Sequence, residues 1–187
     1  MNENEVHYNP FVDPYNGHEY VDLGLPSGTK WATMNVGATS ITDYGNYYQY
    51  GKGANDVSIT SGQSDYSGTE NPLAVSADTA VQVWGGSWHM PTSVQFQELL
   101  DNTTYELVTD YQSSGISGFT FTANGKTLFI PAAGYYVVEE QRVFSGLQYH
   151  SSTPYGSTSS DGLKVEIDIT VDFIYRVDGC PIRPVVG

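Results

Sequence analysis

The sequence predicts a mixed α+β protein that is rich in short β-strands and has few helices. Three observations predict this class. Only 15% of the 187 residues are charged, while 15 are tyrosine and 20 are glycine, and such a composition favours strands and polar turns over a helical bundle. Alternating apolar and polar residues recur along the chain. Helical signals, by contrast, occur at only two short places.

The chain begins with a polar stretch, residues 1–16, that contains two prolines and a few spaced apolar residues. Such a stretch is either a frayed tail or an arm that docks on a second copy or on another protein, and the sequence leaves both alternatives open. Residues 17–187 suffice for a single domain, because a chain of this length buries about two thirds of its unfolded surface.

Residues 20–38, YVDLGLPSGTKWATMNVGA, predict a hairpin-like entry into a buried core. Strand-forming residues precede a turn at Pro26–Gly28, and a second apolar run begins at Trp31. Four tyrosines then follow close together within residues 43–51. Residues 52–75 have no periodicity, which predicts a long loop that is either functional or mobile.

Two helices are predicted in the middle of the chain. The first covers Ala77–Val83 and ends at a pair of glycines. The second begins at Thr92, with Gln95 at capping-box spacing, and runs to Leu100. Its apolar residues have helical spacing, so we expect this helix to lie against a sheet.

The remaining third of the chain returns to strand patterns. Asn124–Gly125 lies between two apolar runs and predicts a β-hairpin. Residues 145–162 are interpreted as a second polar, tyrosine-bearing loop. Apolar and polar residues then alternate from Lys164 to Phe173, which predicts one half-buried strand with an acidic outer face.

The charge balance excludes some classes of partner. Twenty-one acidic residues stand against seven basic ones, a net charge of −14, so nucleic acid and anionic membrane surfaces are disfavoured. No apolar run reaches the ~18 to 20 residues that span a bilayer, and residues 1–10 lack the features of a signal peptide. We expect no nucleic-acid binding and no membrane insertion.

No catalytic or metal-binding pattern is evident in the sequence. The four histidines are scattered without zinc-site spacing, and the single cysteine, Cys180, lies in an apolar context typical of a buried residue. Acidic residues at alternate positions of one strand, such as Asp168 and Asp172, spread along a face and do not gather around a cation. We predict a non-enzymatic protein without a metal or cofactor.

The candidate binding residues are aromatic and lie in the two predicted loops. Tyrosine combined with serine, glycine and asparagine is typical of antibody binding surfaces, because tyrosine offers a large amphipathic contact area at low entropic cost. The alternative is that the tyrosines pack at sheet edges. The candidates are Tyr44, Tyr47, Tyr48, Tyr50 and Tyr66 from the first region and Tyr149, His150 and Tyr155 from the second.

Five ordered runs resemble one bacterial family. They are YVDLGLPSGTKWATMNVGA, DYGNYYQYG, WHMPTSVQFQELL, NGKTLFIPAAGYY and RVDGCPIRPVV, and together they extend from about Gly17 to Gly187. In this order they resemble the major paralogous domain first recognised in Fibrobacter succinogenes and widespread in Bacteroidetes surface proteins. The chain departs from that pattern at Tyr149–Ser152, where members commonly have Tyr-Trp-Ser-Ser, and at Asn102–Tyr105, where they commonly carry a Cys and Trp pair.

The resemblance implies a C-type lectin-like fold with two small antiparallel sheets, two helices, closely paired termini and long loops that present a binding surface. Formylglycine-generating enzymes share this topology, but their chemistry needs paired cysteines. The triplets with which calcium-dependent lectins hold calcium and sugar are also missing here.

Two functions follow from these observations. The first is an extracellular or cell-surface adhesion module that binds a glycan or a protein through its Tyr/Ser-rich loops. The second is a structural protein on the virion surface of a phage that infects Bacteroidetes, such as a fibre or capsid decoration. In that case the arm before Gly17 would dock or trimerise, and no leader peptide would be needed.

Overall fold

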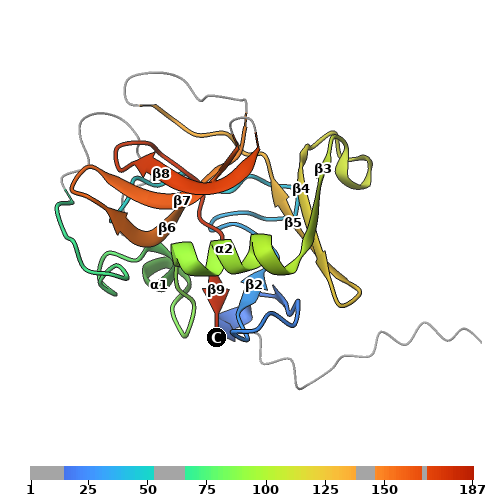
Figure 1. Ribbon diagram of the computed structural model, residues 1–187, viewed down its shortest axis with the longest axis horizontal. Coiled ribbons are helices and arrows are strands. Elements are labelled where there is room, and N and C mark those ends of the chain that lie inside the picture. Colours follow the sequence, from blue (N-terminus) through green and yellow to red (C-terminus); the bar gives the residue numbers. More distant parts are fainter. Residues whose placement is uncertain (1–14, 53–65, 138–145, 166–167) are drawn as a thin grey trace, which may run out of the picture.

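The computed structural model describes residues 15–52, 66–137, 146–165 and 168–187. Their strands form three small antiparallel sheets, which two α-helices accompany (Figure 1). The predicted α+β class and the two helices are therefore confirmed. The expectation of two sheets is wrong, since a third sheet forms from residues interpreted as loop. Residues 1–14 of the predicted arm and 53–65 of the predicted first loop lie outside the described part.

The first sheet joins the two ends of the described chain. Its strands are β1 (Tyr20–Val21), β2 (Lys30–Ala32) and β9 (Val185–Val186), in the order β1-β2-β9. The amide of Gly28 donates to the carbonyl of Leu25 at 2.9 Å and closes the turn between β1 and β2, where Gly28 has a φ of 79° that favours glycine. The predicted hairpin-like entry is confirmed.

The second sheet contains the predicted Asn-Gly hairpin. Its strands are β3 (Thr104–Val108), β4 (Gly118–Ala123) and β5 (Lys126–Pro131), in that order. Asn124 and Gly125 turn the chain with φ angles of 51° and 73°, both positive as a two-residue hairpin turn of this kind requires. The side chain of Asn124 also donates to the carbonyl of Leu23 at 2.8 Å, which ties this turn to the first sheet's hairpin.

The third sheet overturns two sequence interpretations. Its strands are β6 (Gln148–Tyr155), β7 (Ser159–Val165) and β8 (Ile169–Tyr175), in that order. Residues 145–162 are therefore mostly strand, and the alternation from Lys164 to Phe173 belongs to two strands. Val165 pairs with Ile169 across the reversal of the chain. Opposite residues share a face, so the alternation continues unbroken through the turn.

Both helices form close to the predicted places. The first is α1 (Thr79–Trp84), which starts two residues later than predicted because Asp78 caps it by accepting from the amide of Val81. The second is α2 (Ser93–Asn102), which has the predicted capping box of Thr92 and Gln95.

Helix α2 covers the core between the sheets. Figure 1 shows α2 crossing in front of the molecule, between the sheet of β6 to β8 and the sheet of β3 to β5. Its residues Phe96 and Leu99 are fully buried, whereas Val94, which shares the predicted apolar spacing, is 75% exposed. The expectation that this helix lies against a sheet is confirmed.

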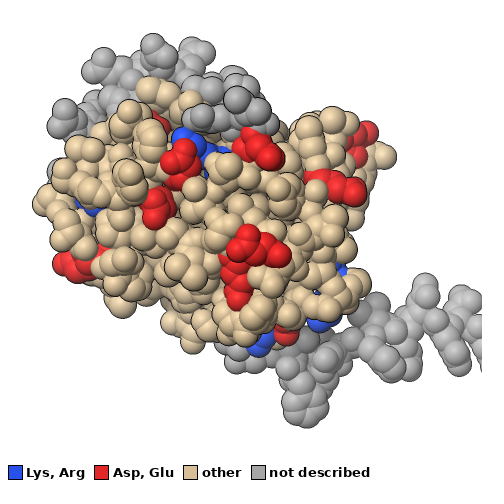
Figure 2. All heavy atoms as spheres, viewed as in Figure 1, with Lys and Arg blue, Asp and Glu red and all other residues tan. Residues whose placement is uncertain are grey.

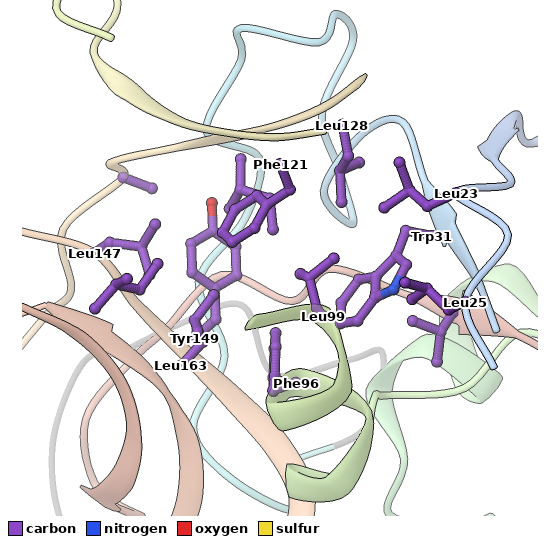
Figure 3. Packing of buried hydrophobic residues seen from close by; sticks show 14 of the residues in the cluster. Leu23, Leu25, Trp31, Phe96, Leu99, Phe121, Leu128, Leu147, Tyr149 and Leu163 are labelled. Atoms are coloured by element: carbon purple, nitrogen blue, oxygen red, sulfur yellow. The ribbon is translucent and has the colours of Figure 1, made fainter. Parts of the chain in front are cut away.

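The main hydrophobic core draws on all three sheets and on α2. Trp31 of β2 packs against Phe96 of α2 with ring centroids 5.3 Å apart. Phe121 and Tyr149 lie on the opposite side of the same core (Figure 3). Trp31 has no exposed surface. The distinctive run at residues 20–38 therefore serves as framework. A second buried cluster surrounds Trp84 and Trp88, whose rings meet edge to face.

Among the strands of the described residues, β8 lies at the edge of its sheet, and two of its backbone amides are occupied by its own aspartates. The carboxylate of Asp172 accepts from the amide of Phe173 at 2.8 Å, and that of Asp168 accepts from the amide of Ile169 at 2.8 Å. Asp172 also pairs with Lys164 of the neighbouring strand at 3.2 Å. These amides are therefore not free to continue the sheet.

A buried arginine connects the end of β8 to three other segments. Arg176 is only 2% exposed, and its guanidinium donates to the carbonyl oxygens of Ser159, Tyr66, Gly68 and Gly156 at 2.9 to 3.2 Å. The guanidinium carbon also lies 4.8 Å from the ring centroid of Tyr50, which adds a cation–π contact. The planar fork of arginine suits such divergent acceptors better than lysine does.

We predict that Arg176→Lys lowers the free energy of unfolding by about 2 to 4 kcal/mol. A lysine ammonium cannot reach four carbonyls at once, so buried acceptors lose their partners. Urea unfolding followed by circular dichroism measures the effect. The exposed substitution Lys126→Met is the control and should stay within about 0.5 kcal/mol of the parent. Equal stability of both variants would contradict this role.

Candidate functional site

Three of the predicted contact tyrosines in the first region are buried. Tyr47, Tyr48 and Tyr50 are 9%, 2% and 1% exposed. The hydroxyl of Tyr47 donates to the carbonyl of Ala133, and that of Tyr50 donates to the carbonyl of Ser152 at 3.2 Å. Their hydroxyls therefore satisfy buried backbone groups. The prediction that these side chains form a contact surface is wrong.

Two candidates of the second region, Tyr149 and His150, are buried as well, with no exposed surface. The physical reason is that they lie in β6, a strand of the third sheet that contributes to the core, and not in a loop. The hydroxyl of Tyr149 donates to the carbonyl of Pro131 at 2.8 Å and accepts from the amide nitrogen of Asn35 at 3.0 Å. Burial raises the pKa of Tyr149 to about 12. Tyr149 and His150 are therefore not part of an exposed contact surface.

His150 and Ser160 form a pair that resembles a base and its nucleophile but is sealed from solvent. The imidazole Nδ1 lies 2.8 Å from Ser160 Oγ, and Nε2 lies 2.9 Å from the carbonyl oxygen of Asp178. A carbonyl only accepts, so Nε2 carries the proton and Nδ1 accepts from the serine. Burial lowers the pKa of His150 to about 4. Both side chains have no exposed surface, and their contact joins β6 to β7 inside the protein.

The other three candidates are at least partly accessible, and the structure places them at different points. Tyr66 is half-buried beside Arg176, and its hydroxyl donates to Glu70 at 3.1 Å. Tyr44 is half-buried and lines a pocket with Leu107 and Phe119 of the second sheet. Tyr155 is 59% exposed at the end of β6. Of the eight candidates, Tyr155 is thus the one that presents most of its side chain to solvent.

Tyr155 belongs to a cluster of exposed rings that we call the aromatic patch, formed by Tyr155, Phe173 and Tyr175. The three side chains are 59%, 38% and 55% exposed. The ring centroids of Tyr155 and Phe173 lie 6.2 Å apart at an interplanar angle of 23°, and those of Phe173 and Tyr175 lie 5.7 Å apart, edge to face. The rings therefore form one contiguous exposed surface.

Strand register explains why these rings meet. Ser159 of β7 pairs with Tyr155 on one side and with Tyr175 on the other, so the two tyrosines share a face of the sheet. Phe173 is two residues from Tyr175 and has the same orientation. Sequence reasoning missed Phe173 and Tyr175 because it assigned Phe173 to the buried face of a single strand. The signal in the sequence that could have identified these two residues is the close spacing of the aromatic side chains in Phe173-Ile174-Tyr175.

Charges of both signs lie beside the aromatic patch. Phe173 pairs across the strands with Asp161, and the ammonium of Lys164 lies 4.6 Å from the Phe173 ring centroid. The amide of Phe173, and then Lys164, hold the pKa of Asp172 below its usual value. In Figure 2 the acidic groups of the visible face lie in several separate places and do not form one acidic field.

The described residues hold neither a metal-type cluster nor a membrane-spanning helix. No three His, Cys, Asp or Glu residues within ranges 15–52, 66–137, 146–165 and 168–187 lie close enough together to hold a metal ion. In the same part of the chain, no helix is long and apolar enough to cross a membrane. Comparison with protein-family models, with curated proteins and with solved structures gave no match.

We predict that His150 makes the protein less stable as the pH falls from about 6.5 to about 4. In this range the unfolded chain binds a proton on His150 that the folded protein excludes, because the folded pKa is about 4 against about 6.5 in the unfolded chain. The expected loss is about 3 kcal/mol. Urea unfolding at a series of pH values measures it, with His150→Gln as the comparison.

The Gln variant removes the titration, whatever its stability at neutral pH. Its free energy of unfolding should therefore fall less steeply than that of the parent over this pH range. Two parallel pH profiles would show that His150 does not titrate differently in the folded and unfolded states.

Proposed function

We propose that the chain is a non-enzymatic recognition module that binds a glycan or a protein through the aromatic patch. The single observation that carries this proposal is the contiguous exposure of Tyr155, Phe173 and Tyr175. Exposed aromatic area that is held in place by a sheet is a favourable binding surface, because rings stack on sugars and on other side chains with little loss of entropy. The candidate surface thus moves from the loops to the end of the third sheet.

The charged residues beside the aromatic patch would fix the orientation of a bound ligand. Asp161 lies opposite Phe173 on the neighbouring strand, and Asp172 precedes Phe173 with 49% of its side chain exposed. Carboxylate oxygens accept hydrogen bonds from the hydroxyl groups of a sugar or from donors of a protein. A few polar groups around an apolar contact area fix the orientation of a ligand. This combination suits a glycan and a protein epitope equally well.

The fold assignment belongs to the same proposal. We propose a C-type lectin-like fold of the Fibrobacter major paralogous type, displayed outside the cell. The supports are the five ordered sequence runs, the two helices, and the pairing of β2 with the C-terminal strand β9. The alternative is a virion fibre or capsid decoration of a Bacteroidetes phage. It depends on the arm at residues 1–14, which lies outside the described residues.

An array of polysaccharides, glycans and surface proteins, probed with the purified chain, tests the proposal. We expect at least one binder, and we expect Tyr155→Ala and Tyr175→Ala each to weaken it about threefold to tenfold, the loss of one aromatic contact. Leu107→Ala, which truncates another exposed apolar residue on the second sheet, is the matched control and should bind like the parent. Absence of any binder, or binding that is insensitive to both tyrosine variants, would refute the proposal.

A further inference from the structure

A pocket lies apart from the aromatic patch, beside the second sheet. Its volume is about 410 Å³, and its walls include Tyr44, Leu107 of β3, Phe119 of β4, Leu147 and Val165. Leu147 belongs to the buried core, and Tyr44, Phe119 and Val165 pack against that core. The pocket is therefore backed by the main hydrophobic core, which holds these walls in place.

The walls of this pocket leave apolar surface in contact with water. Leu107 is 61% exposed at its rim, and Tyr44, Phe119 and Val165 are half-buried. Small residues such as Gly115 and Ala132 complete the lining and leave the space open. A concave, mostly apolar surface of this size is typical of small-molecule sites.

The chemistry of the lining defines the ligand. Among the residues that the structure describes, those that line this pocket carry no charged side chain, although the whole chain has 21 acidic and seven basic residues. An ion would lose hydration here without gaining a partner. The hydroxyl of Ser117 donates to the carbonyl of Thr109 at 2.8 Å, so its oxygen retains lone pairs that accept a hydrogen bond. The pocket therefore favours a neutral ligand that carries a donor.

We propose that this pocket binds an uncharged compound of one or two rings that carries a hydrogen-bond donor. An apolar cavity of about 150 Å³ holds one benzene ring, so the observed volume of about 410 Å³ accommodates two. The proposal does not depend on the aromatic patch, and either site can exist without the other.

Indole is the probe that tests this proposal, because it is neutral, has two fused rings and carries one N–H donor. The full chain is labelled with ¹⁵N and titrated with indole while amide shifts are recorded. We expect saturable shifts at the amides of Gly115, Ser117 and Ala132, with a Kd of about 1 mM or tighter. Indole-3-acetate, which carries a negatively charged acetate group on the same ring system, should bind at least about tenfold more weakly.

Variants separate this pocket from other surfaces. Leu107→Ala removes wall area and should weaken indole about threefold, while Ala132→Leu fills the space and should abolish the shifts. Val94→Ala, which truncates another exposed aliphatic residue on α2, and Tyr155→Ala in the aromatic patch should leave indole binding unchanged. Absence of shifts in the parent, equal binding of indole-3-acetate, or insensitivity to both pocket variants would overturn the proposal.

Discussion

The end of the third sheet depends on a buried cation. Arg176 withdraws a charge from water at the end of β8 and offsets that cost with four backbone carbonyls from two segments and a cation–π contact with Tyr50. Two rings of the aromatic patch are its direct neighbours, because Tyr175 precedes it and Tyr155 precedes Gly156, whose carbonyl it binds. Backbone held in this way gives the patch a preset shape, and a preset surface loses less entropy when it engages a partner.

The tyrosine-rich composition has two different physical uses in this chain. Tyr47, Tyr50 and Tyr149 bury their rings and satisfy carbonyl groups inside the protein, as buried phenols must. Tyr155 and Tyr175 expose theirs. Composition alone cannot separate the two uses, because both select a ring with a polar end. The distinction lies in position along the third sheet: Tyr149 lies near the start of β6 against the core, whereas Tyr155 and Tyr175 end β6 and β8.

The sequence predicts features that depend on neighbouring residues well, and features that depend on residues far apart in the chain poorly. The capping box at Thr92, the Asn124–Gly125 turn and both helices depend on neighbouring residues, and all are present. The third sheet depends on how three segments pair. The reversal between Val165 and Ile169 preserves the alternation of side chains, so no break in the pattern marks it. The aromatic patch was missed for a different reason, since Phe173 continues the apolar face of Ile169 and Val171 and yet is 38% exposed near the end of β8.

Strand β8 exposes aromatic rings and also lies at a sheet edge, which is the combination that most readily recruits another strand. The carboxylates of Asp168 and Asp172 occupy the amides of Ile169 and Phe173, so an incoming strand would have to displace two charged groups before it could pair. The two aspartates therefore oppose the addition of a strand at this edge, as charged groups on edge strands of natural sheets do.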